Sequence, residues 1–257
     1  MAAALVRAMR WFLAILLSFS SSTALAQQCV VLLHGLGRTD ASMLVMAEVL
    51  SSAGYHVVNE GYASSEQPVE MSIQQVGASV SACGAAQPIN FVTHSLGGIL
   101  VRAWLRDNRP ENLGRVVMLG PPNKGSEVVD QFGDLALFRY LTGPAGQQLG
   151  TSENGMPKQL GPANFDVGIV AGNRTIDPLL SSAFDGPNDG KVSVESTRLD
   201  GMRDHIVLPT THTFMMNNPL VIAQTLAFLR SGRFDHDLTM GEVVRRMIGI
   251  EGSPSTP

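Results

Sequence analysis

Residues 91–98, Phe-Val-Thr-His-Ser-Leu-Gly-Gly, form the most informative segment of the chain. An apolar run over 89–92 leads into Ser95, and an apolar, helix-favouring segment follows the two glycines. A strand, a sharp turn and a helix in this order are typical of a nucleophile elbow, with the serine at the apex of the turn. Such a turn needs small residues two positions from the serine. Gly97 meets this need, whereas Thr93 stands where a glycine is usual. The alternative is an ordinary Ser-Gly turn.

Apolar runs rich in β-branched residues alternate with segments of helical period on both sides of this stretch. Continuous apolar runs are expected of strands that are buried on both faces of a parallel sheet. The predicted strands are 29–33, 55–59, 89–93, 115–119, 166–171 and 206–208, and the predicted helices are 42–53, 69–83, 99–108 and 218–229. The sequence therefore predicts an α/β fold with a mostly parallel central sheet and helices on both faces. Catalytic groups in such sheets lie at the carboxyl ends of the strands.

A length of 257 residues suits one sizeable α/β domain or a small two-domain protein. We predict a signal peptide over 1–26, one domain over 27–232, and a partly disordered tail over 233–257 with a short helix within 240–250. Residues 143–164 are rich in glycine, proline and polar residues. They are predicted to form a short lid-like insertion, and a passive surface loop is the alternative.

The first 26 residues have the pattern of a secretory signal. Arg7 and Arg10 precede a short apolar run over 11–19, and a small-residue cleavage motif stands at 24–26. Cleavage would leave Gln27 as the first residue. An uncleaved anchor is the alternative, but the run is shorter than the roughly 20 apolar residues that span a bilayer. The sequence therefore predicts export to the periplasm or the medium.

Composition excludes some partners and suggests one cross-link. Hydrophobic residues make up 44% of the chain and charged residues 16%, with a formal net charge of −4 and no basic block. Nucleic acid is therefore not an expected partner. The two cysteines, Cys29 and Cys83, suggest one disulfide in an exported chain, with two separate buried thiols as the alternative. No cluster of metal-binding residues stands at ligand spacing, so no metal or cofactor is predicted.

A reactive serine needs a base that takes its proton, and we predict that His212 is this base. His212 lies just beyond the last predicted strand, at the carboxyl end that also carries the serine. The alternatives are His205, which precedes that strand, and His236, which lies in the tail. His94 adjoins the serine and is predicted to be a packed, hydrogen-bonded histidine.

The base in turn needs an acid that orients it, and Asp189 is the predicted acid. It lies in the turn-rich loop 186–192, after the strand over 166–171 and ahead of the histidine in the chain. Asp177 and Asp185, which precede these residues after the same strand, are rivals. The alternative is that residues 188–190, Asn-Asp-Gly, form an ordinary turn without a catalytic role.

Two backbone N–H groups are predicted to stabilise the oxyanion. Leu36 lies in the glycine-containing loop 33–37 after the first predicted strand, and Leu96 follows the serine. The predicted substrate pocket is apolar and is lined by Leu36, Leu96, Leu135 and Phe138. The alternative for Leu135 and Phe138 is that they simply pack in the core.

Three motifs together resemble the α/β-hydrolases, and within them the bacterial triacylglycerol-lipase-like serine esterases and lipases. Residues 34–37 resemble the lipase oxyanion loop, and residues 93–98 resemble the lipase elbow. Residues 120–126 are similar to a Pro-x-x-Gly-Ser segment found after the next strand in many lipases. The resemblance spans residues 30 to about 230. It implies the α/β-hydrolase fold and a serine nucleophile at Ser95. It also places the strand that starts at Cys29 beside the strand that starts at Pro88, which favours pairing of Cys29 with Cys83.

The combined expectation is an exported serine hydrolase that cleaves carboxylic esters, an esterase or lipase, without a cofactor. The expected partners are an ester or lipid substrate and, transiently, a lipid surface. The alternatives are acyl transfer or cleavage of thioesters, amides or phospholipids by the same three residues, and a non-catalytic binding module on the same fold.

Overall fold

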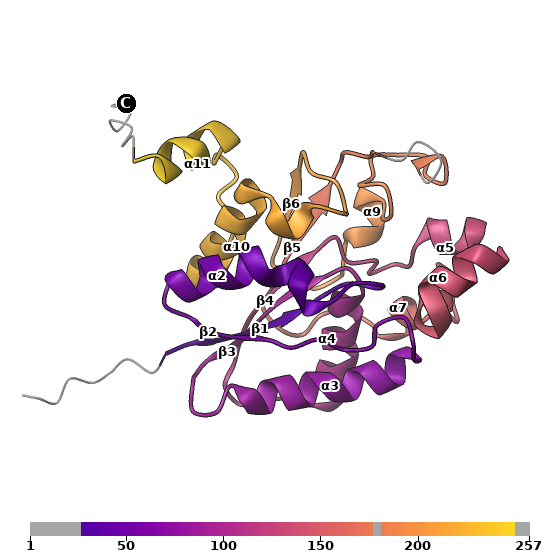
Figure 1. The fold of residues 1–257 in the computed structure, drawn as a ribbon, viewed down its shortest axis with the longest axis horizontal. Helices are drawn as coiled ribbons and strands as arrows, with labels where there is room; N and C mark the ends of the chain where they lie inside the picture. Colours follow the sequence, from indigo (N-terminus) through magenta and orange to yellow (C-terminus); the bar gives the residue numbers. More distant parts are fainter. Residues whose placement is uncertain (1–26, 177–180, 250–257) are drawn as a thin grey trace, which may run out of the picture.

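The computed structural model describes residues 27–176 and 181–249, and its centre is a parallel sheet (Figure 1). Within these residues the sheet has six strands in the order β2-β1-β3-β4-β5-β6, and every neighbouring pair is parallel. The strands are β1 (Cys29–Leu33), β2 (His56–Asn59), β3 (Ile89–His94), β4 (Leu113–Leu119), β5 (Val167–Gly172) and β6 (Asp204–Leu208). The predicted parallel α/β architecture is therefore confirmed.

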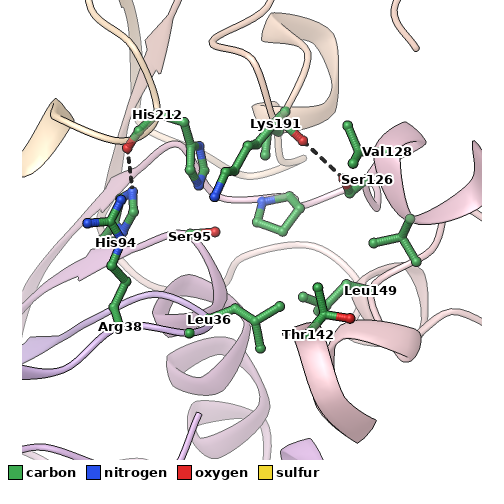
Figure 2. A pocket seen from close by; sticks show the side chains of 14 residues that line it. Leu36, Arg38, His94, Ser95, Ser126, Val128, Thr142, Leu149, Lys191 and His212 are labelled. Carbon is green, nitrogen blue, oxygen red and sulfur yellow. Dashed lines mark hydrogen bonds between the residues drawn. The ribbon is translucent and has the colours of Figure 1, made fainter. Parts of the chain in front are cut away.

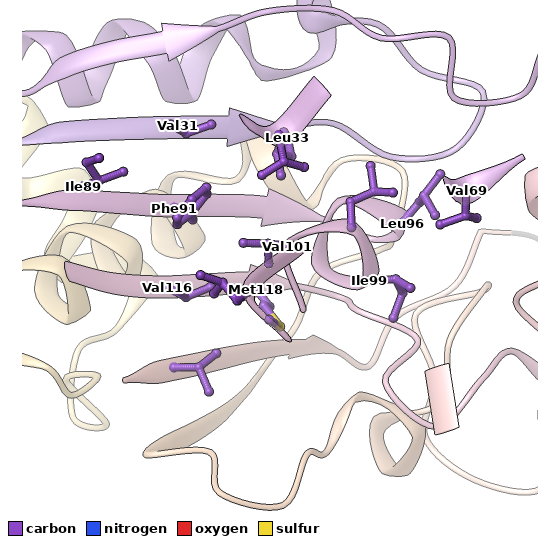
Figure 3. Close-up of a cluster of buried hydrophobic side chains, with 14 of the residues drawn as sticks. Val31, Leu33, Val69, Ile89, Phe91, Leu96, Ile99, Val101, Val116 and Met118 are labelled. Carbon is purple, nitrogen blue, oxygen red and sulfur yellow. The ribbon is translucent and has the colours of Figure 1, made fainter. Parts of the chain in front are cut away.

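Helices cover both faces of the sheet. The longer helices in the described chain are α2 (Leu44–Ser52), α3 (Val69–Ala82), α4 (Leu96–Asp107), α6 (Ala136–Gln147), α10 (Pro219–Ser231) and α11 (Met240–Met247), of which α2 and α10 cover one face and α3 and α4 the other. Shorter helical segments are η1 (Asp40–Met43), α5 (Glu127–Phe132), α7 (Met156–Gln159), α9 (Val194–Thr197) and η2 (Met215–Asn217). Successive side chains of a strand point to opposite faces of the sheet, so each strand contributes apolar residues to the core on both faces. Val31 and Phe91 pack towards α3 and α4 (Figure 3), whereas Val30 and Val92 pack towards α2 and α10.

Helix α4 begins at Leu96, three residues before the predicted start, because two glycines belong to the helix. Glycine is a poor helix former, so the sequence favours a later start. A Cβ atom at Gly97 would lie 2.5 Å from the carbonyl oxygen of Leu33, and one at Gly98 would lie 3.0 Å from the Cβ of Pro121. The two glycines thus let α4 lie directly against β1 and the loop after β4.

The segment between β4 and β5 is more helical than the sequence pattern suggests. It contains α5, α6 and α7, and α6 runs into the start of the predicted insertion at 143–164. Helix α6 is kinked at Gly143, which has φ 61° and ψ −166° and is followed by Pro144. Gly143 and Pro144 are typical of a loop, so the sequence pattern does not indicate that helix continues on both sides of them.

The predicted segments at the two ends of the chain are only partly described. Residues 1–26, which carry the predicted signal peptide, lie outside the described residues, as do residues 250–257. Helix α11 forms within the segment where a short helix was expected, and it starts with a capping box between Thr239 and Glu242. In residues 27–176 and 181–249, no helix has the length and apolar character needed to cross a membrane.

Cys29 and Cys83 form a disulfide, as predicted. Cys29 starts β1, and Cys83 follows the last residue of α3, with 5.7 Å between their Cα atoms. The N–H of Cys29 also donates to the carbonyl of Pro88, 3.0 Å away, just before β3. The disulfide therefore ties the end of α3 to the amino-terminal end of β1, opposite the carboxyl ends of the strands.

Candidate active site

Ser95 stands at a strained turn between β3 and α4. Its φ is 52° and its ψ is −118°, and it is the sole non-glycine residue with positive φ in the described part of the chain. This backbone region is unfavourable for residues with a Cβ atom, and such strain is concentrated at functional sites. The N–H of Ser95 donates to the carbonyl of Leu119, 2.9 Å away, which holds the turn against β4. The hydroxyl is thus presented at the carboxyl end of the sheet.

Asp189 and His212 meet in a buried hydrogen bond. Asp189 Oδ2 lies 2.7 Å from His212 Nδ1, and the two residues are only 2% and 4% exposed. The other carboxylate oxygen, Oδ1, accepts from the N–H groups of Lys191 (3.0 Å) and Val192 (2.8 Å). A carboxylate only accepts hydrogen bonds, so the imidazole carries its proton on Nδ1 and leaves Nε2 free to take another.

Gly120 makes room for this pair. It has φ +55°, and a Cβ atom there would lie 3.0 Å from Asp189 Oδ2 and 3.1 Å from His212 Nδ1. The N–H of Gly120 donates to Val170 at 2.8 Å, which fixes the loop after β4 to β5. The glycine that opens the predicted 120–126 motif therefore allows the carboxylate and imidazole to pack against the end of β4.

Ser95 and His212 line the same cavity (Figure 2). The Ser95 hydroxyl makes no hydrogen bond with any residue in 27–176 or 181–249. The structure therefore brings Asp189 and His212 together and places Ser95 at the same cavity. The hydrogen bond between the Ser95 hydroxyl and the His212 imidazole is not formed.

His94 joins the serine strand to the loop of His212. Its Nε2 donates to the carbonyl oxygen of His212 at 3.0 Å, and Nδ1 has no partner in the described chain. Burial, followed by the charges of His212 and Arg38, holds the pKa of His94 well below its ordinary value. The ring is therefore neutral. This agrees with the sequence-based view of a packed, hydrogen-bonded histidine, although His94 also lines the cavity.

Tyr62, which the sequence analysis did not identify, fixes the loop 34–37. Its ring stacks on that of His34 with 4.0 Å between centroids, and its hydroxyl donates to the His34 carbonyl. The N–H of Tyr62 donates to His34 Nε2 at 3.2 Å, so the His34 proton is on Nδ1, which donates to the carbonyl of Gly35. Burial lowers the pKa of His34 and so favours this neutral form.

The two predicted oxyanion donors are the backbone N–H groups of Leu36 and Leu96. Leu96 is the first residue of α4, and its N–H has no partner four residues earlier in the helix. Among the described residues, neither this N–H nor that of Leu36 donates a hydrogen bond. Leu36 lines the cavity that also contains Ser95.

The cavity has a volume of about 580 Å³ and a largely apolar wall on one side (Figure 2). Its apolar lining is Leu36, Pro122, Val128, Val129, Leu149 and Val192, its polar lining is Arg38, His94, Ser95, Ser126, Thr142, Lys191 and His212, and Gly37 completes it. Of the predicted substrate contacts, Leu36 is in this wall. The Leu96 side chain is instead fully buried in the core, because the first turn of α4 faces the sheet.

Of the remaining predicted substrate contacts, Leu135 is not in the wall. Leu135 is 56% exposed, and it precedes α6 on the outer surface rather than facing the cavity. The side chain of Phe138 lies outside what the structure describes. Val128 and Val129 of α5 supply apolar surface in their place, and the sequence analysis missed them because it predicted no helix there.

The rival histidines and acids lie elsewhere. His205 is in β6, where Nε2 contacts Thr197 Oγ1 at 2.9 Å, and His236 Nε2 contacts Asp204 Oδ1 at 3.0 Å. Asp185 is exposed, and Asp177 is outside the described residues. No group of three or more His, Cys, Asp or Glu residues in the described ranges is arranged to hold a metal ion.

No protein-family model and no curated protein sequence matches the chain. Similarity is found among solved structures. The mature form of the Bacillus licheniformis lipase BlEst2 superposes with a TM-score of 0.63 at 19% identity, over 80% of this chain and 93% of that one. Phospholipase PlaB from Legionella pneumophila has a TM-score of 0.62 at 17% identity, over 87% of this chain and 63% of that one.

A third similar structure is the metagenomic carboxyl esterase MGS0156, with a TM-score of 0.59 at 17% identity over 88% of this chain and 76% of that one. Identities this low establish a shared fold and not a shared substrate. The chain therefore has the α/β-hydrolase fold that the three sequence motifs suggested.

Proposed function

We propose that this protein is a serine hydrolase that cleaves carboxylic esters. The observation that carries the proposal is the strained Ser95, which shares a cavity with a buried, hydrogen-bonded Asp189–His212 pair. Three solved structures with the same fold are described as a lipase, a phospholipase and a carboxyl esterase. These descriptions support a lipolytic activity.

In the proposed reaction, His212 Nε2 takes the proton of Ser95 while the serine oxygen attacks the ester carbonyl carbon. Asp189 holds the imidazole in the Nδ1–H tautomer and stabilises the cation that forms. The N–H groups of Leu36 and Leu96 donate to the oxyanion, and each such donor is worth about 3 kcal/mol. The imidazolium then protonates the departing alkoxide, which leaves an acyl group on the serine. Water, activated by the same imidazole, releases the acid and restores the serine.

The lining of the cavity supports an acyl substrate. Val128, Val129 and Leu149 present aliphatic surface to the space next to the serine. Leu149 belongs to the predicted insertion 143–164, and we propose that this insertion, together with α5 and α6, covers the acyl chain. An apolar wall of this kind also suits transient contact with a lipid surface.

Export completes the proposal. The signal sequence over 1–26 predicts it, and the Cys29–Cys83 disulfide supports it because such bonds persist in oxidising compartments. Mass spectrometry of the secreted protein is expected to find Gln27 at the amino terminus. An intact leader on protein recovered from the medium or periplasm would contradict the cleavage.

Hydrolysis of 4-nitrophenyl esters of increasing acyl length tests the activity. We expect turnover that Ser95→Ala abolishes. Ser126→Ala is the matched control, because this hydroxyl lines the same cavity but donates to the carbonyl of Lys191 at 3.0 Å. It should retain turnover of the esters. Rising rates on long, aggregated esters would indicate a lipase, and a preference for short soluble esters would indicate an esterase. Absence of turnover on every ester would favour a non-catalytic binding module.

A further inference from the structure

Two cationic side chains line the cavity, and they come from two different loops. Arg38 follows the oxyanion loop after β1, and Lys191 follows Asp189 in the loop after β5. Arg38 Nη2 donates to the carbonyl of Thr213, 3.3 Å away, so the guanidinium lies next to the loop of His212. Figure 2 shows the Lys191 side chain reaching into the cavity towards Ser95 and His212.

No aspartate or glutamate is among the fourteen described residues that line the cavity. Arg38 forms no ion pair with a described residue. Both cations also lie close enough to His94 to help lower its pKa, after burial and the charge of His212. A concave site lined by one sign of charge concentrates ligands of the opposite sign.

The charges occupy one side of the cavity and the aliphatic residues the other. Arg38 and Lys191 lie on the side of His94 and His212, while Val128 and Leu149 lie across the cavity from them (Figure 2). In the proposed reaction the imidazole must reach the oxygen of the leaving alcohol. The alcohol part of the ester is therefore on the cationic side, and the acyl part faces the aliphatic side.

We propose that the substrates are esters whose alcohol part carries an anionic group, with phosphate the best match to a guanidinium and an ammonium. Arg38 and Lys191 are the residues that select it. The inference rests on the proposed ester hydrolysis, and it adds the chemical class of the leaving group. It predicts that a glycerol ester is cleaved faster when its glycerol carries a phosphate.

The experiment compares two soluble substrates with the same acyl chain, hexanoylglycerol 3-phosphate and hexanoylglycerol, by the release of hexanoate. We expect kcat/KM to be at least about tenfold higher for the phosphate ester, the equivalent of one charge-assisted hydrogen bond. The preference should shrink as NaCl is raised from 50 to 500 mM, because salt screens exposed charges. A third substrate, glycerol monoadipate, carries its anion on the acyl side and should gain no such preference.

Variants assign the preference to the two cations. Lys191→Gln and Arg38→Gln should each lower the ratio of the two kcat/KM values, and Lys191→Arg should retain it. Lys158→Gln is the matched control, since Lys158 is paired with Glu153 and does not line the cavity. This control should keep the wild-type ratio.

Different experimental results would contradict the inference and the proposed function. Cleavage of the neutral ester that depends on Ser95, without preference for the phosphate ester, would overturn the inference and leave the hydrolase intact. A preference for the adipate ester, or a phosphate preference that survives both glutamine variants, would also overturn it. If no ester is cleaved, the proposed function fails and the inference fails with it.

Discussion

Replacing Asp189 by asparagine tests the proposed catalytic pair with almost no change in shape. In the structure, Asp189 Oδ1 accepts two backbone N–H groups, and Oδ2 faces His212 Nδ1 at 2.7 Å. The amide oxygen of Asp189→Asn must take the place of Oδ1 because only an acceptor satisfies those donors. The amide NH₂ then points at the imidazole. His212 must accept at Nδ1 and carry its proton on Nε2, where it can no longer receive the serine proton.

The expected loss is large because the wrong tautomer removes the base. An equivalent change in a serine protease lowers kcat about 10⁴-fold, which corresponds to about 5 kcal/mol of transition-state stabilisation. Stability should change little, since the variant keeps the volume of the side chain and both backbone hydrogen bonds. The assay is kcat on a 4-nitrophenyl ester, paired with thermal unfolding followed by circular dichroism.

Asp185→Asn is the matched control, because it removes an exposed carboxylate from the same loop. Its kcat should stay within about twofold of the wild type, as for most surface substitutions. A folded Asp189→Asn protein that keeps more than about a tenth of the wild-type kcat would refute the reasoning. Equal losses in the two variants would refute it as well.

Three further outcomes are expected. Replacing Cys29 and Cys83 by alanine opens a loop with a sequence separation of 54 and should lower the free energy of unfolding by about 4 kcal/mol; an unchanged urea midpoint would contradict this. Gly120→Ala places a methyl group about 3 Å from the carboxylate–imidazole pair and should lower kcat far more than it lowers the melting temperature; unchanged kcat would count against the pairing. Burial, followed by the charge of Arg198, lowers the pKa of His205 to about 4. Between pH 6.5 and about 4, the unfolded chain therefore binds a proton at this histidine that the folded chain does not bind. Stability should therefore fall as the pH falls through that window, and less so in His205→Gln; equal slopes in urea titrations of the two proteins would exclude this cause.

Much of the fold follows from the sequence because a parallel sheet buries both faces of its strands. The apolar runs that become β1, β3 and β5 are buried along their whole length, and the last four residues of β4 are buried too, so composition alone marks them. Their alternation with helices fixes which loops meet at the carboxyl edge. This is why residues as far apart as Ser95, Asp189 and His212 could be sought together, even though the last two are separated by 23 positions.

The lining of the cavity could not be predicted in the same way. It depends on α5 and α6, and the Gly143–Pro144 kink hides the helical period that would reveal α6. Leu135 is apolar, but the turn before α6 places it on the outside, a choice that the local sequence does not encode.

Contacts between distant loops could not be predicted from the sequence either. The stacking of Tyr62 on His34 joins residues 28 apart, and Tyr62 itself lies outside any helix or strand. The direction of the long Lys191 side chain depends on the turn that Asp189 stabilises by accepting the Lys191 N–H. Neither feature leaves a periodic pattern in the sequence, since both arise from tertiary packing.

The location of a covalent adduct is the most direct test of a reactive alcohol at the strained turn. After incubation with an alkyl fluorophosphonate, peptide mapping by mass spectrometry should find one adduct per chain, on Ser95, formed far more slowly in the Asp189→Asn protein. A protein that hydrolyses esters but carries its adduct on another residue, or remains unmodified, would contradict the account.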